Sequence, residues 1–234
     1  MGTFTISAEV FARIPNLRVA VAVADGLDNA APHPEIEAFW RAAWREAAAA
    51  SVYGNAQSHP RVKPWRDTFA RMGVSGKQFP SSVEALLRRA LKGGEPFTIN
   101  PLVDYYNAIS LRRLVPAGAF DRDDIHDTLE LRLSRPGDTF QALDDATPIE
   151  VPAGEVSYTT GQTIITRHIV WRQSRAGLVT PATNRAILVS EVLAELGPDS
   201  PDEVVGDFTR GLRDYFGVSS RTWIVRADQP AIAW

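Results

Sequence analysis

A predicted helix lies at the centre of this chain: Asn100-Pro-Leu-Val-Asp-Tyr-Tyr-Asn-Ala-Ile-Ser-Leu-Arg-Arg-Leu114. Asparagine is a favoured N-cap because its side chain accepts a hydrogen bond from a free amide of the first turn, and proline fits the first helical position. Asn100 and Pro101 therefore mark the start of the helix. The chain then continues through Pro116-Ala-Gly-Ala-Phe-Asp121, which predicts a turn.

Two polar side chains interrupt the apolar face of this helix. At about 100° of rotation per residue, the side chains on that face are Val103, Asn107, Ser110 and Leu114, flanked by Tyr106 and Leu111. Tyr105 and Arg112 point the opposite way. A buried amide or hydroxyl without a partner costs roughly 1–3 kcal/mol. Asn107 and Ser110 therefore either tie a neighbouring loop or strand to the helix or face a pocket.

Hydrophobic periodicity predicts helices before this helix and mainly strands after it. The elements expected before it are strands at 4–7 and 17–24, helices at 34–50, 61–72 and 81–92, and a polar loop at 52–59. Those expected after it are strands at 127–134, 139–143, 155–159 and 164–171, helices at 181–196 and 201–216, and a strand at 222–226. The pattern favours one mixed α/β domain over residues 1–234, with layered mixed sheets and flanking helices.

Composition excludes several classes of function. The chain has 234 residues and no cysteine, which rules out disulfides and thiolate metal sites and fits a cytoplasmic protein. Its apolar runs are too short to span a membrane, and the N-terminus has no signal-peptide pattern. The four histidines lack metal-ligand spacing, and no nucleotide-binding glycine loop is present. We therefore expect no metal, no cofactor and no amino-acid activation by a complete synthetase.

Basic residues are concentrated in one part of the sequence. Residues 61–113 hold ten lysines and arginines against four acids, which gives this segment a net charge of +6. Because the whole chain has a net charge of −3, the remaining residues have a net charge of −9. Such clustering attracts phosphate backbones, which makes RNA a candidate partner, with Arg88, Arg89 and Lys92 as candidate contacts. The alternative is that these charges lie on solvated helix faces.

The central motifs resemble a known family. Val103, Asp104 and Asn107 form a Val-Asp-x-x-Asn helix, and a Pro-x-x-Ala-Phe-Asp turn follows at 116–121. Both look like the editing and tRNA-binding module, the B3/B4 domain, of the phenylalanyl-tRNA synthetase beta subunit. Weaker turn motifs extend the resemblance over roughly residues 60–195, through Leu129–Leu133, Pro136-Gly-Asp138 and Gly154-Glu155.

The resemblance implies an editing pocket that hydrolyses tyrosine wrongly attached to phenylalanine tRNA. Asn107 keeps the family residue, whereas Tyr106 stands where the family has threonine and Gly118 where it has histidine. Gln173 aligns with a glutamate that recognises the misacylated side chain. On this basis Asn107 and Gln173 are the candidate catalytic residues. The candidate substrate-binding residues are Tyr106, Ser110, Gly118, Arg172 and Thr180.

A second pattern near Gln173 suggests an anion site. Basic residues cluster beside His168 at Arg167, Arg172 and Arg175, and Thr180, Thr183 and Asn184 are expected to cap the predicted helix 181–196. Arginines beside a helix N-terminus can bind a carboxylate or a phosphate. The alternative is that these arginines lie at strand ends and pair with surface acids.

Three kinds of function fit these observations. The favoured one is an RNA-binding, tRNA-directed module, which as an enzyme would be a free-standing aminoacyl-tRNA hydrolase that clears misacylated tRNA. The alternative is a small-molecule protein, a binder or an enzyme, that retains a pocket for an amino acid or carboxylate without tRNA activity. The third is an interaction protein without chemistry.

Overall fold

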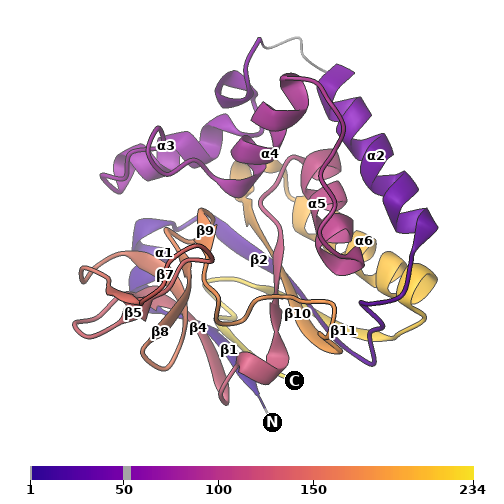
Figure 1. Cartoon of the computed structure of the whole chain (residues 1–234). Helices are drawn as coiled ribbons and strands as arrows, with labels where there is room; N and C mark the ends of the chain where they lie inside the picture. The colour runs from indigo at the N-terminus through magenta and orange to yellow at the C-terminus, as the bar shows by residue number, and fades with distance from the viewer. Residues whose placement is uncertain (1, 50–53) are drawn as a thin grey trace.

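The computed structural model describes residues 2–49 and 54–234, which form two β-sheets covered by helices (Figure 1). The smaller sheet is antiparallel, with strands in the order β11 (Ser220–Val225), β2 (Leu17–Asp25), β10 (Arg185–Leu193) and β3 (Gly118–Asp121). The larger sheet has the order β12 (Ala231–Ala233), β1 (Thr3–Ile6), β4 (Thr128–Leu133), β7 (Val156–Thr160), β8 (Thr163–Arg167), β5 (Thr139–Phe140) and β6 (Ile149–Glu150), and β9 (Arg172–Gln173) pairs with β8. The two chain ends lie together because β1 pairs with β12 (Figure 1).

Strand β2 separates two cores. Its residues alternate: Val19, Val21 and Val23 pack in the core between the two sheets, and Ala20, Ala22 and Ala24 pack under the helices. Side chains of a strand alternate between faces, so one strand serves both layers. The large valines fill the inter-sheet core, and the small alanines let the helices come close to the sheet.

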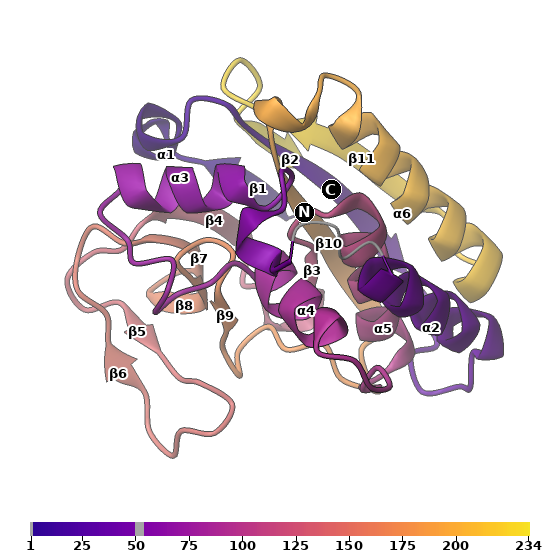
Figure 2. The same ribbon diagram turned by 90° about the horizontal axis from the view of Figure 1, so that it is seen from above.

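Six α-helices occur among the described residues. They are α1 (Ala8–Arg13), α2 (Pro34–Ala49), α3 (Lys63–Arg71), α4 (Ser82–Leu91), α5 (Pro101–Arg113) and α6 (Ser200–Phe216). Helices α5 and α6 cover the alanine face of the smaller sheet, and α2 and α4 pack on α5 (Figure 2). Helices α1 and α3 instead contribute side chains to the inter-sheet core. None of the described helices is both long and apolar enough to cross a membrane.

Helix α5 has the predicted start, and its burial agrees with the prediction except at Leu114 and Tyr105. The Asn100 side chain accepts a hydrogen bond from the amide of Val103 at 3.1 Å, and Arg112 is exposed. Leu114 is only partly buried because it ends the helix in the left-handed conformation, with φ of 53°. Tyr105 points away from the predicted face but is also buried, because α6 covers it; the close approach requires Gly211, where an added Cβ would lie 2.1 Å from the tyrosine oxygen.

The prediction of a helix at 181–196 is wrong: this segment is strand β10, between β2 and β3. Its alanines, leucines and glutamates have good helical propensity, but pairing with distant strands on both sides overrides local preference. The strand predicted at 164–171 ends at Arg167, where a turn begins, and the predicted turn at 116–121 contains strand β3. The other predicted strands and helices form with shifted ends. Ala50 and the first residues of the predicted loop 52–59 lie outside the described residues.

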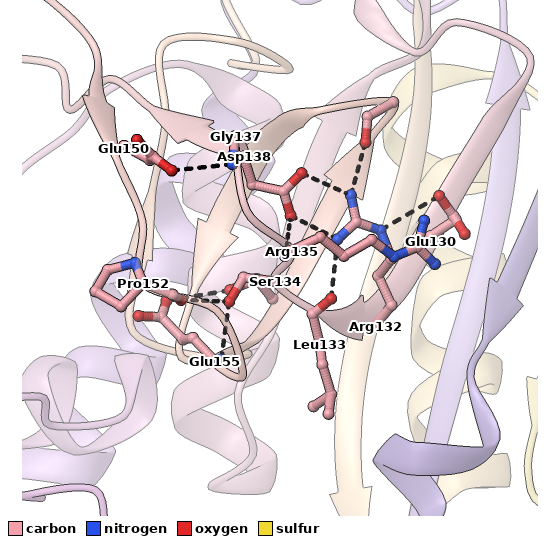
Figure 3. A network of polar contacts seen from close by, with 12 residues as sticks. Glu130, Arg132, Leu133, Ser134, Arg135, Gly137, Asp138, Glu150, Pro152 and Glu155 are labelled. Atoms are coloured by element: carbon pink, nitrogen blue, oxygen red, sulfur yellow. Dashed lines mark hydrogen bonds and ion pairs between the residues drawn. The ribbon is translucent and has the colours of Figure 1, made fainter.

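A buried ion pair holds the connection between β4 and β5 (Figure 3). The Arg132 guanidinium donates to both carboxylate oxygens of Asp138, at 2.6 and 3.1 Å, and to the carbonyls of Leu133 and Gly161. The Asp138 carboxylate also accepts from the Arg135 amide at 2.7 Å. The segment Pro136-Gly-Asp138 therefore forms a turn and also supplies the aspartate that pairs with the buried Arg132.

Candidate functional site

A pocket of about 170 Å³ lies between α5, the smaller sheet and the turn that joins β8 to β9. Asn107, Gly118 and Gln173, which the sequence analysis linked to one site, all line it. The full lining is Ser82, Tyr106, Asn107, Ala117, Gly118, Ala119, Phe120, Tyr158, Thr166, Ile169, Val170, Trp171, Arg172, Gln173, Val189 and Glu191. We call this cavity the Asn107 pocket. The fold thus brings together residues that lie far apart in the sequence.

Asn107 presents an amide without a protein partner. Its side chain is 8 % exposed, lines the pocket, and makes no hydrogen bond to any residue in 2–49 or 54–234. Ser110, one turn later on α5, is different: its hydroxyl donates to the Val115 carbonyl at 2.6 Å, and it does not line the pocket. Of the two alternatives for this helix face, Ser110 follows the structural one and Asn107 follows the pocket one.

The two departures from the family pattern on α5 and β3 shape the pocket wall. Tyr106 is almost fully buried beside Asn107, and burial raises its hydroxyl pKa, so it stays neutral. Gly118 leaves open space: a Cβ added there would meet no atom within 4 Å, and its backbone is not in the left-handed region. A Cβ therefore fits at Gly118 without backbone strain.

Gln173 lines the pocket, but its amide nitrogen is already engaged. It donates to the carbonyl oxygens of Ala119 at 3.2 Å and of Gly177 at 3.0 Å. The side chain thus links strand β9 to strand β3 across the pocket. Its carbonyl oxygen is the group left to face a ligand.

A glutamate that sequence reasoning missed lines the same pocket. Glu191 lies on β10, on the face toward the larger sheet, and accepts a hydrogen bond from the Tyr158 hydroxyl at 2.5 Å. Burial raises the pKa of the Glu191 carboxyl to about 7, although the Tyr158 hydrogen bond opposes this. The signal in the sequence was a single acid among apolar residues with strand alternation, Ile187, Val189 and Leu193. The helix prediction for 181–196 concealed it.

The wall opposite α5 is a strained turn. His168 and Ile169 both have left-handed backbones, with φ of 44° and 55°, which is rare for a β-branched residue such as isoleucine. The Ile169 amide donates to the Val156 carbonyl, and the Ser82 amide at the start of α4 donates to the Val170 carbonyl, both at 2.7 Å. These bonds fix the turn against β7 and α4.

No helix starts at residue 181, so the helix N-terminus on which the predicted anion site depended is absent. Of the three arginines, only Arg172 follows the alternative of pairing with a surface acid, Asp144; Arg167 pairs with the buried Glu155 at 2.6 Å. Arg175 donates to the Leu143 carbonyl. Thr180 does not line the pocket; its carbonyl accepts from Asn29 at 2.7 Å.

The basic segment 61–113 is largely internally paired. Arg66 and Arg88 both bind the carboxylate of Glu84, at 2.5 Å each, and Arg113 binds Asp207 at 2.6 Å. Arg89 lies over the Phe97 ring at 5.1 Å from its centroid, and Lys92 ends α4. Of the residues expected to contact RNA, Arg88 and Arg89 lie in the last turn of α4 and Lys92 is its C-cap, at the opposite end from Ser82, the residue of α4 that lines the Asn107 pocket.

Other cavities lie elsewhere among the described residues, and two of them are the following. One of about 170 Å³ is lined mainly by alanines and leucines of α2, α4 and α5, and one of about 330 Å³ adjoins Glu155 and His168. Neither contains Asn107, Gly118 or Gln173. Among the described residues, no group of three or more histidine, aspartate and glutamate side chains is arranged to hold a metal ion.

Comparison with protein-family models agrees with these motifs. The family model for the B3/4 domain matches residues 64–197. A solved structure of an N-terminal fragment of the phenylalanyl-tRNA synthetase beta-subunit from Pyrococcus horikoshii is similar, with 8 % identity and a TM-score of 0.48 over 96 % of this chain and 54 % of that one. A search of curated proteins finds no match. Because the family model covers more than half of its residues, this chain belongs to the B3/4 domain family.

Proposed function

We propose that this chain binds an aminoacyl group in the Asn107 pocket, presented at the end of a tRNA, and slowly hydrolyses its ester. The observation that carries the proposal is the side-chain amide of Asn107: the residue is 8 % exposed, lines a pocket of about 170 Å³, and makes no side-chain hydrogen bond to a described residue. An amide that faces a cavity and has no protein partner is available to form hydrogen bonds with a ligand. The family resemblance makes an aminoacyl ester the expected ligand.

Each end of the pocket suits a different part of that ligand. The Asn107 amide can donate to the ester carbonyl and stabilise the oxyanion that forms when water attacks it. The Glu191–Tyr158 pair lies between the two sheets and suits recognition of a polar group on the aminoacyl side chain. The walls between them, which include Phe120, Ile169 and Val189, exclude water from the side chain.

The proposed hydrolysis is slow because no histidine lines the pocket. A general acid–base group typically contributes about 10²–10⁴-fold to the rate. With glycine at position 118, positioning of the ester and oxyanion stabilisation carry the reaction, with the ribose hydroxyl of the tRNA as a further source of help.

A second candidate function is a pocket for a free amino acid or carboxylate without tRNA. The specific support is the pairing of Arg66, Arg88 and Arg113 with acids, which removes much of the positive charge that phosphate binding needs. Under the tRNA proposal, Arg89 and Lys92 remain the candidate contacts. Salt dependence separates the two, since tRNA affinity falls steeply with salt and binding of a neutral zwitterion does not.

The test is release of labelled amino acid from a panel of correctly and wrongly charged tRNAs. We expect slow release from at least one charged tRNA, reduced by Asn107→Ala and Gln173→Ala. Gly118→His restores an imidazole in open space and should raise the rate about tenfold or more. Gly118→Ala is the matched control, because it fills space without adding a proton-transfer group.

Two results decide between the candidates. Release at the buffer rate from every charged tRNA, also by Gly118→His, contradicts hydrolysis. If a free amino acid then still raises the melting temperature of the wild-type protein but not of Asn107→Ala, the small-molecule function stands instead.

A further inference from the structure

The mouth of the Asn107 pocket holds three groups suited to bind an anion. Ser82, Asn107 and Arg172 all line it. Neither the Ser82 hydroxyl nor the Asn107 amide makes a hydrogen bond to a residue that the structure describes. The hydrogen bond from the Ser82 amide to the Val170 carbonyl, at 2.7 Å, ties the start of α4 to the turn that leads into Arg172. This bond ties the backbone that carries Ser82 to the backbone that leads to Arg172.

Arg172 is already paired with a carboxylate of the same chain. Its guanidinium pairs with the carboxylate of Asp144, and the two side chains are 42 % and 74 % exposed. Asp144 lies in the connection between β5 and β6, which is held by other bonds: Arg175 donates to the Leu143 carbonyl at 2.7 Å, and Gln141 donates to the Asp145 carbonyl at 3.1 Å. Asp144 thus stays beside the mouth without needing Arg172.

An exposed ion pair of this kind is weak, because both charges are well solvated and the pairing is screened by salt. A ligand anion that also reaches Ser82 and Asn107 gains hydrogen bonds that Asp144 does not make. Arginine presents a planar fork of donors that matches the two oxygens of a carboxylate or phosphate. Displacement of Asp144 by such a ligand is therefore favourable.

We propose that Arg172 and Ser82 form a subsite for an anionic group of the pocket ligand, joined by Asn107 where that group is a carboxylate, and that Asp144 pairs with Arg172 until that group displaces it. The inference rests on the proposed function in one respect, that the pocket takes an aminoacyl-like ligand. The anion is either the carboxylate of a free amino acid or the phosphate beside a terminal adenosine. Both offer the same anionic oxygens to the guanidinium.

Calorimetric titration of the full chain with matched probes tests the subsite. L-tyrosine is compared with L-tyrosinamide, in which a neutral amide replaces the carboxylate, and adenosine monophosphate with adenosine. Arg172→Gln should weaken the charged member of one pair by roughly tenfold or more and change its neutral counterpart little. The affected pair identifies the source as carboxylate or phosphate.

The role of Asp144 has its own test and control. Asp144→Asn frees Arg172 and should tighten binding of the same charged probe by about two- to fivefold. Asp145→Asn removes a neighbouring negative charge that pairs with no described residue, so it reports the general electrostatic effect alone and should change affinity less.

Three outcomes overturn the proposal. They are an unchanged charged-to-neutral affinity ratio in Arg172→Gln, equal effects of Asp144→Asn and Asp145→Asn, and no binding of either charged probe to the wild-type and Asp144→Asn proteins. A failed subsite is distinguishable from a failed pocket, because Arg172→Gln would then still bind the neutral probes. If the protein does not deacylate tRNA but Arg172→Gln and Asp144→Asn change the affinity for the charged probe as expected, only the proposed hydrolysis is contradicted.

Discussion

The Arg132 network and the Asn107 pocket both contain buried polar side chains, but their hydrogen bonds are distributed differently. In the network, the Arg132 guanidinium makes four hydrogen bonds, two of them to the Asp138 carboxylate (Figure 3). In the pocket, the Asn107 amide makes none to the described residues. A buried arginine that is paired with a carboxylate fixes the fold, whereas an amide that faces a cavity without a protein partner is available to a ligand. Burial alone does not distinguish the two, but the partners do.

The largest expected effect is on the network. Asp138→Ala leaves the Arg132 charge buried without its carboxylate, which should lower the free energy of unfolding by about 3–5 kcal/mol. Urea denaturation measures it. Asp144→Asn, which breaks an exposed pair, is the control and should cost at most about 1 kcal/mol.

A double variant sharpens this result. Arg132→Met combined with Asp138→Leu removes both charges and should recover much of the stability that Asp138→Ala loses, because no unpaired charge remains buried. If Asp138→Ala costs no more than Asp144→Asn, the network does not hold the fold and the contrast between the two regions is lost.

The next effect concerns the pH dependence of stability. Burial raises the pKa of Glu191 from an ordinary 4.5 to about 7, so between these values the folded protein holds a proton that the unfolded chain releases. The stability that this proton gives to the folded protein is therefore fully present below pH 4.5. It is lost as pH rises through 7, and the free energy of unfolding falls by up to about 1.4 kcal/mol per pH unit. Glu191→Gln should remove that decline.

Asp104 provides the control for this measurement. Burial raises its pKa to about 6, so it adds a decline of the same sign at lower pH, and Asp104→Asn should remove only that part. Unfolding free energies of the three proteins between pH 5 and 8 are compared as differences from wild type. A Glu191→Gln difference that is flat with pH would show that the carboxyl is ionised throughout this range.

A smaller effect separates two polar residues of α5. Ser110→Ala removes the hydrogen bond to the Val115 carbonyl and should cost about 1–2 kcal/mol of stability. Asn107→Ala removes no hydrogen bond to a described residue and should cost less, under about 1 kcal/mol, while abolishing ligand binding. Equal stability losses, with equal effects on binding, would mean that the two residues have the same role.

The sequence predicts helix α5 well because its signals are local. The N-cap at Asn100, the proline that follows it and the exposure of Arg112 all agree with the structure. The alternation of valine and alanine in β2 likewise follows from a strand with two covered faces.

The different roles of Asn107 and Ser110 could not be predicted, since both lie on one face of the helix. The left-handed residue Leu114 ends α5 and brings the Val115 carbonyl back within reach of the serine hydroxyl. Likewise Glu191 meets Tyr158 only because β10 is a strand between β2 and β3, facing the larger sheet. Such contacts depend on pairing between segments far apart in sequence, which local patterns do not encode.

The most direct test of the central claim is an NMR titration that follows the side-chain amides of the asparagines. The ligand is an adenosine whose 3′-hydroxyl is replaced by an amide-linked tyrosyl group, which cannot be hydrolysed. Asn29 and Asn100 serve as internal controls, because their amides already donate to Thr180 at 2.7 Å and to Val179 at 3.2 Å. We predict a saturable shift of the Asn107 amide with little change in the other two. An unmoved Asn107 resonance at saturation, or equal shifts of all three, would contradict the claim that Asn107 is the free polar group of a ligand pocket.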